Sequence, residues 1–339
     1  MPTGSLNPLT TPGWDDLVLT AGEYSFFHSS AWIRVLCESY GYKPVFFAVY
    51  KNGGLSSVLP LLEVNSFLTG RRAVSLPFSD YCEPLLFGDA SLTAIPDGLI
   101  DFSRNWKHID FRAQTLFTPD VPVYSRYVRH TLKLSTPEQL LSGLHKNTAR
   151  NLKKARASGL QIEVSGSFEA TREYYKLHCL TRKRQATPPQ PFSFFRKIYE
   201  HVFLPDKGRV ILAYHEHKPI AGAVFFHLGK KAMYKFGASD LAYSALGGNA
   251  AIMWEAISRY ALEGFDTFCF GRTDLDNEGL RRFKASFGAT EEPLCYYRYD
   301  PKSAKFLAGR PDTGPHQFLR RLPMPLLRLA GELLYRHVG

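Results

Sequence analysis

Apolar positions in the first half of the chain fall into short runs typical of β-strands, with helical spacing between some of them. Residues 43–66 hold two such runs joined by Asn52-Gly53-Gly54, a pattern typical of a β-hairpin. The elements expected after this hairpin are strands at 72–77, 108–112 and 126–134 and a helix at 91–106. Strands that alternate with helices in this way predict an α/β fold.

A second unit is expected to begin at Thr136. Residues 136–139 combine an N-cap threonine, a proline at the first helical position and a capping-box glutamine, so a helix is predicted from there through Ser158. The elements expected after it are strands at 160–164, 209–215, 219–228 and 231–239 and helices at 168–185 and 192–203.

Two segments, VFFAVYKNGGLSSVLPLL and VILAYHEHKPIAGAVFFHL, share a pattern of strand, polar turn, small residues and strand. Internal duplication is the simplest interpretation, although two generic hairpins would look alike. At 339 residues the chain also exceeds the usual size of one domain. We therefore predict two tandem α/β units, each a mixed central sheet flanked by helices, over 1–135 and 136–300, followed by a tail at 301–339.

The tail carries a helical repeat. Leu326, Leu329, Ala330 and Leu333 recur at helical spacing, and arginines and a glutamate lie elsewhere on the wheel. Residues 325–338 are therefore expected to form a basic amphipathic helix. Two interpretations remain open: the helix packs on the protein's own core, or it makes a peripheral contact with the inner membrane surface.

Composition and charge narrow the class of protein. A hydrophobic content of 45% with 22% charged residues is typical of a globular protein and argues against disorder. The net charge of +11 favours polyanionic partners, for which we consider tRNA or lipid phosphates but not DNA, although a role in solubility alone is equally open. No signal peptide or membrane span is apparent, which predicts a cytoplasmic location.

Several reaction classes lack their motifs. The five cysteines are scattered without a CxxC pair, so we expect reduced thiols and no zinc site. The pair His215 and His217 borders a turn and lacks further ligands, so no metal site is predicted. Neither a GxSxG elbow, a P-loop nor a Cys–His signature is present, which argues against a hydrolase or an NTPase.

A glycine pair is the first candidate for chemistry. Gly247 and Gly248 follow a strand and precede a helix that is expected to begin near Asn249. Free backbone N–H groups at the positive end of a helix dipole attract pyrophosphate or carboxylate, and glycine lets an anion approach closely. We predict donor binding by these three residues, with a plain tight turn as the alternative.

Basic residues on the helix that opens the second unit are the second candidate. Lys146, Arg150, Lys153 and Lys154 share one face by their spacing. This face is predicted to bind the phosphates of tRNA or lipid, and an ordinary solvated face is the alternative.

Three segments occur in a characteristic order: GRRAVSLPFSDYCEPLLF, LHKNTARNLKKARASGLQIE and FGRTDLDNEGLRRFKASFGATEEPLCYYRY. Together with LPMPLLRLAGELLYRHVG they resemble the FemAB family of the GNAT acetyltransferase superfamily, in an acetyltransferase-like branch. The resemblance implies two GNAT-like units and transfer of an acyl group to an amine. One departure is that Ser244 or Ala245 stands where GNAT proteins commonly have Arg or Gln before the glycine turn.

The resemblance also implies site residues. The pair Phe283 and Lys284 matches a Phe-Lys pair of the family, so Phe283 is expected at the donor and Lys284 is expected to stabilise charge on the reacting oxygen. Asp80 and Tyr81 match a loop that faces the acceptor, where Asp80 would bind or deprotonate its ammonium. A solvated lysine and a turn-forming aspartate are the alternatives.

Arg272 is a further catalytic candidate, because it follows a glycine at the end of a buried strand, where open α/β sheets bind ligands. Its alternative is a salt bridge to Asp274 or Asp276.

Three functions remain open from the sequence. The first is an N-acyltransferase that moves an acyl group from acyl-CoA to an amine of a cell-envelope precursor or polysaccharide component. The second is an aminoacyl-tRNA-dependent transferase of the peptidoglycan-bridge type. The third is a non-catalytic GNAT-like module that binds the membrane surface.

Overall fold

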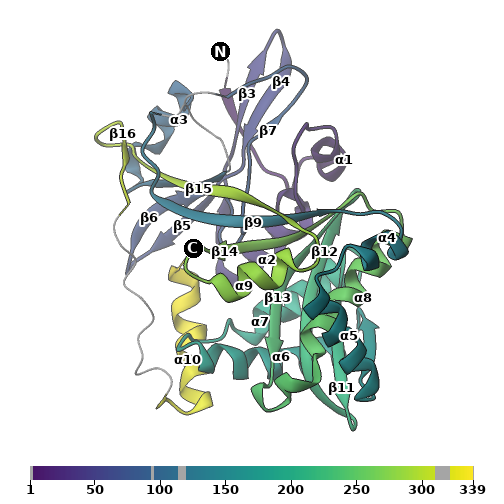
Figure 1. Ribbon diagram of the computed structural model, residues 1–339. Coiled ribbons are helices and arrows are strands. Elements are labelled where there is room, and N and C mark those ends of the chain that lie inside the picture. Colours follow the sequence, from purple (N-terminus) through teal and green to yellow (C-terminus); the bar gives the residue numbers. More distant parts are fainter. Residues whose placement is uncertain (1–2, 93–94, 114–119, 310–320, 339) are drawn as a thin grey trace. The chain divides into compact units, whose positions relative to one another are not determined.

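The computed structural model describes residues 3–92, 95–113, 120–309 and 321–338 (Figure 1). The chain forms two compact units. Unit 1 comprises Met1–Val128, Pro293–Asp312 and Leu333–Gly339, and unit 2 comprises Arg129–Glu292 and Thr313–Glu332. The division into domains at 1–135, 136–300 and 301–339 remains a prediction from the sequence.

Unit 1 contains the predicted hairpin. Its turn lies at Asn52 and Gly53, which both take positive φ (53° and 78°), as two-residue hairpin turns require. The hairpin strands belong to a four-stranded antiparallel sheet of order β1-β3-β4-β7. Its members are β1 (Thr3–Leu6), β3 (Phe46–Lys51), β4 (Gly54–Leu59) and β7 (Leu85–Leu86).

A second set of strands in unit 1 has the order β15-β8-β6-β5-β2, with β16 paired to β15. Only β6 and β8 are parallel among these pairs in the described part of unit 1. The strands are β2 (Lys43–Pro44), β5 (Leu62–Ser66), β6 (Gly70–Val74), β8 (Ile109–Ala113), β15 (Thr290–Asp300) and β16 (Lys305–Leu307). Leu61, Trp106 and Phe111 are among the buried side chains of its core.

The helices of unit 1 are short. They are α1 (Trp14–Leu19), α2 (Ser30–Tyr40) and α3 (Asp97–Phe102), with 3₁₀ turns at Phe26–His28, Ser103–Asn105 and Tyr335–His337. The helix predicted at 91–106 is therefore wrong at both ends, because the described residues 91–92 and 95–96 are not helical and α3 ends at Phe102. Pro96 is the N-cap of α3, and a proline disfavours helical backbone in the residue before it, so the helix begins only after Pro96.

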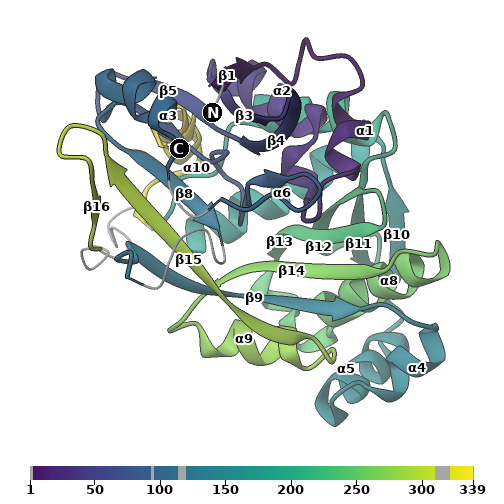
Figure 2. The ribbon, with the colours of Figure 1, turned by 90° about the horizontal axis from the view of Figure 1, so that it is seen from above.

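Unit 2 is built on a mixed sheet of order β10-β11-β12-β13-β14, followed by β9, which crosses the division between the units (Figure 2). The pairs from β10 to β13 are antiparallel, whereas β13 and β14 are parallel. The strands are β9 (Ser125–Lys133), β10 (Gln161–Ser165), β11 (Gly208–His215), β12 (Lys218–Leu228), β13 (Lys231–Ser239) and β14 (Thr267–Asp274). A parallel pair needs a crossover connection, which helix α8 supplies here.

Helices cover both faces of this sheet. Helix α8 packs on β11 and β12, and α6 packs on β12 and β13. Ala221 and Ala223 share a core with α8, whereas a side chain at Gly222 would meet Tyr174 of α6. Since alternate residues of a strand point to opposite faces, the two helices lie on opposite sides. The helices are α4 (Pro137–Ser142), α5 (Lys146–Ala157), α6 (Phe168–Arg184), α7 (Phe192–Ile198), α8 (Gly248–Leu262) and α9 (Glu278–Ala285), with α10 (Met324–Leu334) near the C-terminus.

The predicted continuous helix from Thr136 through Ser158 is wrong, because the structure has two helices there. Thr136 caps α4 as expected, but α4 ends at Ser142, with Gly143 as its C-cap. A new cap then starts α5, where His145 Nδ1 accepts from the N–H of Asn147. Glycine is a weak helix former and His145 competes for backbone donors, so the helix breaks between them. Among the described residues, no helix is long and apolar enough to cross a membrane.

Candidate acyl-donor site

The predicted glycine turn lies at the N-terminus of α8. Gly247 takes φ 77° and is the N-cap, and the helix begins at Gly248. The first intrahelical bond runs from the N–H of Ala251 to Gly247 O (3.1 Å). The N–H groups of Gly248, Asn249 and Ala250 therefore have no acceptor within the described chain, and the helix has no side-chain cap. Three such donors at the positive end of a 15-residue helix form a natural anion site.

These amides border a small pocket of about 120 Å³. All four predicted donor-binding residues line it: Gly247, Gly248, Asn249 and Phe283. The other lining residues are Asn151, Ile220, Ala221, Ser239, Asp240, Tyr243, Ser244 and Ala250, of which the sequence singled out only Ser244. They come from α5, from β12, from the end of β13, from the 3₁₀ segment Leu241–Leu246 and from α8, and no motif links them in sequence.

The packing of neighbouring protein atoms leaves little space for a side chain at either glycine. A Cβ on Gly248 would lie 3.3 Å from Ala221 Cβ and 3.6 Å from Ile220 Cδ1. A Cβ on Gly247 would lie 2.9 Å from Asn151 O, and φ at Gly247 is positive. The sequence interpretation attributed these glycines to the close approach of an anion. In the structure they also let α5 and β12 pack against the start of α8.

Polar groups at the end of β13 complete the pocket wall. Asp240 accepts from the N–H of Ala242 through Oδ1 (3.1 Å) and from Lys218 Nζ through Oδ2 (3.4 Å). Lys218 also donates to Tyr243 Oη (3.3 Å), and this hydrogen bond raises the pKa of the Lys218 ammonium. Lys218 is therefore charged at neutral pH and offsets the Asp240 carboxylate beside the pocket.

Helix α5 places its basic face beside the same turn. Thr148, Leu152 and Ala155 are its buried residues, and α5 packs on α8. The four predicted polyanion-binding residues, Lys146, Arg150, Lys153 and Lys154, are all exposed. Because α5 reaches Gly247 through the carbonyl of Asn151, a ligand phosphate at the α8 N-terminus would lie near a cationic surface.

Strands β13 and β14 part next to the pocket. Their parallel pairing runs only from Lys231 to Met233, opposite Thr267 to Cys269. The β12–β13 ladder also shifts register between Val224 and Phe225, an irregularity typical of a β-bulge. Beyond Met233 and Cys269 the two strands continue, to Ser239 and Asp274, without further pairing to each other. Arg272 was expected to follow the end of this strand, but β14 continues past it to Asp274.

Lys284 braces the parted stretch of β14. Its side chain is 1% exposed, and Nζ donates to Gly271 O (2.9 Å) and to Arg272 O (3.1 Å). Phe283, the preceding residue of α9, lines the pocket instead. Arg272 lies within β14, with an exposed side chain. The catalytic roles predicted for Lys284 and Arg272 stay predictions.

A buried histidine lies within reach of the Lys284 charge. His130 on β9 is fully buried, and its Nε2 lies 3.2 Å from Glu291 Oε2. Burial, and after it the charge of Lys284, lowers the pKa of His130. The imidazole is therefore neutral at physiological pH. Sequence reasoning missed this residue, since an isolated histidine in a strand gives no signal.

The loop with Asp80 and Tyr81 belongs to unit 1 and is rigidly held. Tyr296 Oη donates to Asp80 O (2.7 Å), and Arg112 Nη1 donates to Ser79 O (2.9 Å) and Leu76 O (3.3 Å). Leu76 and Phe78 take φ values of 56° and 60°, which are strained for residues with large side chains. Of the predicted site residues, the four donor-binding ones line one pocket in unit 2, and the acceptor roles of Asp80 and Tyr81 stay predictions.

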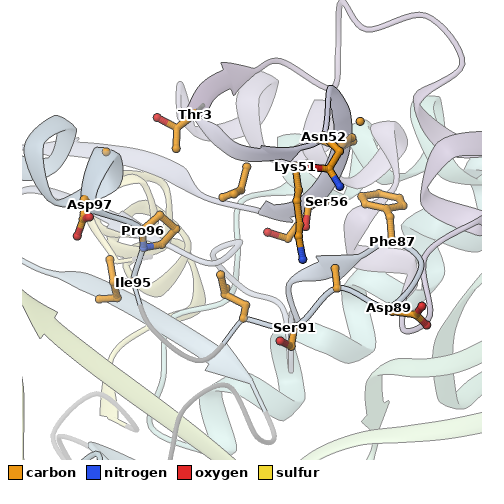
Figure 3. A pocket seen from close by; sticks show the side chains of 17 residues that line it. Thr3, Lys51, Asn52, Ser56, Phe87, Asp89, Ser91, Ile95, Pro96 and Asp97 are labelled. Atoms are coloured by element: carbon orange, nitrogen blue, oxygen red, sulfur yellow. The ribbon is translucent and has the colours of Figure 1, made fainter. Parts of the chain in front are cut away.

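Unit 1 also has a larger recess, of about 740 Å³ (Figure 3). Its lining includes Lys51, Asn52 and Ser56 from the hairpin and Phe87 and Asp89 from the segment after β7. None of the predicted site residues lines it. The recess offers hydroxyl, amide and charged groups beside an aromatic ring, a lining suited to a polar ligand.

Residues 142–285 match the family model of the acetyltransferase (GNAT) domain. This segment is a GNAT domain. It contains the glycine turn, the parted strands and the Phe283-Lys284 pair, and the prediction of an acyltransferase of the GNAT superfamily is confirmed. No curated protein matches the chain by sequence.

Solved structures show the same fold over most of the chain. A FemX structure aligns with a TM-score of 0.64 at 13% identity, covering 87% of this chain and 97% of FemX. A tandem GNAT protein from the clavulanic acid biosynthesis pathway aligns with a TM-score of 0.56 at 12% identity, covering 92% of this chain and 99% of that protein. The C-terminal domain of a putative lysylphosphatidylglycerol synthetase from Agrobacterium fabrum aligns with a TM-score of 0.54 at 14% identity, covering 83% of this chain and 90% of that domain. The predicted tandem GNAT-like α/β fold is confirmed.

Proposed function

We propose that this acyltransferase is a cytoplasmic enzyme that moves an acyl group from acyl-CoA to a primary amine of a cell-envelope precursor or polysaccharide component. The observation that carries the donor assignment is the set of three unpartnered amides at the α8 N-terminus, directly beside the parted strands β13 and β14. A pyrophosphate fits the first feature, and an extended acyl-pantetheine chain fits the second, because it can hydrogen-bond to strand edges.

In the proposed reaction, the neutral amine attacks the thioester carbonyl. The carbon–nitrogen bond forms, the carbon–sulfur bond breaks, and CoA leaves as a thiol that takes up the proton lost by the amine. Negative charge develops on the carbonyl oxygen during this step. Backbone N–H groups in the stretches where β13 and β14 are not paired with each other, and the ammonium of Lys284, are the candidates to stabilise that charge. Asp80 is the candidate to bind the acceptor ammonium before it loses its proton.

A second donor, aminoacyl-tRNA, is favoured by one observation. The exposed basic face of α5 abuts the same glycine turn, and a tRNA acceptor stem would present phosphates to both. The similarity in fold to FemX and to a lysylphosphatidylglycerol synthetase domain is compatible with either donor. The first experiment must therefore compare the two donors directly.

The test measures thermal stabilisation of the protein by acyl-CoA and by aminoacyl-tRNA, each at low and high salt. We expect stabilisation by acyl-CoA. Asn249→Asp should weaken it about tenfold in affinity, since a carboxylate at this position repels an anionic donor while remaining favourable for the helix dipole. Asn249 is exposed, so the variant should fold normally.

Asn105→Asp is the matched control, because it adds the same charge at an exposed site in unit 1. Stabilisation by charged tRNA alone, falling steeply with salt and lost in Lys153→Ala/Lys154→Ala, would assign the second donor. If neither donor stabilises the protein, or if Asn249→Asp and Asn105→Asp respond alike to acyl-CoA, the proposed donor site is wrong.

A further inference from the structure

Helix α10 presents an apolar stripe to solvent. Leu326 and Leu329 are each 51% exposed and Leu333 is 60% exposed. Their spacing places all three on one side of the helix. The helix packs on unit 2 through its other side, where Leu327 is fully buried and a Cβ on Gly331 would collide with the Pro189 carbonyl. The stripe that the sequence singled out is therefore not what attaches the helix to the protein.

Unit 1 displays a second exposed apolar feature, the turn between β5 and β6. Phe67 is 87% exposed and Leu68 is 57% exposed. The turn is ordered, because Ser66 Oγ accepts from the N–H groups of Leu68 (3.1 Å) and Thr69 (3.0 Å). Two large apolar side chains are thus held outward at the tip of a hairpin. Exposed apolar groups of this kind usually mark an interaction surface.

The C-terminal segment secures this turn. His337 is buried, its ring lies 4.6 Å from the Phe67 ring, and Nδ1 lies 3.0 Å from Ser66 Oγ. Its carbonyl accepts from Thr69 Oγ1 (3.1 Å) and Arg72 Nη2 (3.0 Å). The next residue, Val338, is 56% exposed beside the turn. These contacts lie within unit 1, so the tip and the chain end after α10 form one built surface.

The charge around these apolar groups is positive. The stretch 321–338 holds three exposed arginines, Arg321, Arg328 and Arg336, against one glutamate, Glu332. Lys107 is exposed beside the β5–β6 turn, since its Cδ lies 3.4 Å from the position of a Cβ on Gly70. Apolar side chains with flanking cations match the boundary of an anionic lipid bilayer, where acyl chains lie beneath phosphate headgroups.

We propose that the α10 stripe inserts into the headgroup region of an anionic bilayer, with the arginines of 321–338 bound to lipid phosphates, and that the Phe67-Leu68 turn of unit 1 makes a separate insertion of its own. The proposal is independent of which acyl donor the enzyme uses. It differs from a transmembrane anchor, because the apolar groups are few and lie on a folded surface.

The test is co-sedimentation of the full chain with vesicles of phosphatidylglycerol and phosphatidylcholine, compared with phosphatidylcholine alone. We expect binding only with the anionic lipid, weakening as salt rises. Leu326→Ser/Leu329→Ser/Leu333→Ser should lower the partition coefficient by at least about tenfold, since three apolar side chains are lost from the contact. The Phe67→Ser/Leu68→Ser variant should lower it in the same direction.

The matched control is Leu204→Ser/Leu241→Ser/Leu262→Ser, which changes three leucines that are 62%, 57% and 75% exposed elsewhere. It should bind as the unmodified chain does. Three results would overturn the proposal: no binding to anionic vesicles, equal binding by the stripe and control variants, or unchanged binding by the turn variant. A lipid-free dimer in sedimentation velocity that the stripe variant abolishes would likewise overturn it, in favour of a second copy of the chain.

Discussion

Two cations, Lys284 in unit 2 and Arg112 in unit 1, hold irregular backbone in the same way. Lys284 donates to the carbonyls of Gly271 and Arg272, and Arg112 donates to those of Leu76 and Ser79. Their surroundings differ. Lys284 is almost fully buried, whereas Arg112 is partly exposed and lies 5.5 Å from the centre of the Tyr296 ring.

The backbone that each cation holds differs as well. Gly271 takes φ 70°, which costs a glycine little, whereas Leu76 and Phe78 take φ 56° and 60° at a cost of about 1–2 kcal/mol each. Unit 2 thus supports an unstrained segment with a buried charge, and unit 1 supports a strained loop with a more exposed one. Strained backbone that its surroundings hold in place is typical of ligand-contacting loops. Lys284 therefore supports the donor side, whereas Arg112 fixes the loop that is predicted to bind the acceptor.

The largest effect is expected from Lys284→Met, which removes the charge and keeps most of the side-chain volume. If Lys284 stabilises the reacting oxygen, kcat should fall about 10²-fold, the value typical of one oxyanion donor, with little change in KM for the donor. The measurement is CoA release during acyl transfer, with folding checked by circular dichroism.

Lys176→Met is the matched control, because Lys176 lies on the surface of α6 in an ion pair with Glu173. Its kcat should stay unchanged. A folded Lys284→Met protein with normal kcat would reduce Lys284 to a structural brace and make the two cations equivalent.

A smaller effect is expected from Arg112→Met. The loop would lose two charged hydrogen bonds and a cation–π contact, so the free energy of unfolding should fall by about 2 kcal/mol in urea titration. KM for the acceptor should rise more than kcat falls, because the loop carrying Asp80 and Tyr81 is predicted to bind that substrate.

Arg104→Met offers a comparison for Arg112, since the exposed Arg104 only pairs with Asp101 on the surface and should cost less than about 0.5 kcal/mol. An Arg112→Met protein that is as stable as Arg104→Met would show that the strained loop holds its shape without the clamp.

Some of the features around these two cations could be predicted from the sequence, and others could not. The glycine turn and the hairpin at Asn52 and Gly53 could be predicted, because glycine and asparagine favour the positive φ values that such turns need. The Phe283-Lys284 pair could be predicted from its resemblance to a family motif. The break between α4 and α5 could not, since it depends on His145 acting as a cap and on its N–H donating to Ser286 O, far along the chain.

The strained loop and the pocket wall escaped prediction for a similar reason. Leu76 and Phe78 are residues that normally avoid positive φ, and only contacts from Arg112 and Tyr296 keep the loop in place. Asn151, Ser239 and Tyr243 meet at the α8 N-terminus through the fold alone. The local sequence therefore predicts backbone conformations that depend on glycine. It does not predict conformations that depend on contacts with side chains far away in the sequence.

The smallest expected effect is a change in how the free energy of unfolding depends on pH, caused by the influence of the Lys284 charge on the pKa of His130. Burial, and then Lys284, lowers the pKa of His130 below its ordinary 6.5, with Glu291 and Arg281 also facing it. The folded protein therefore leaves His130 neutral while the unfolded chain takes up a proton near pH 6.5, so this part of the stability is complete above that pH and is lost as pH falls through it toward the folded pKa.

In Lys284→Met, the pKa of His130 should rise, and the fall in unfolding free energy between about pH 7 and about pH 5 should become shallower. Urea titrations across this range measure the slope, and Arg112→Met, which alters a cation in the other unit, should leave it unchanged. Equal slopes in the unmodified chain and Lys284→Met would mean that the ammonium does not act on His130.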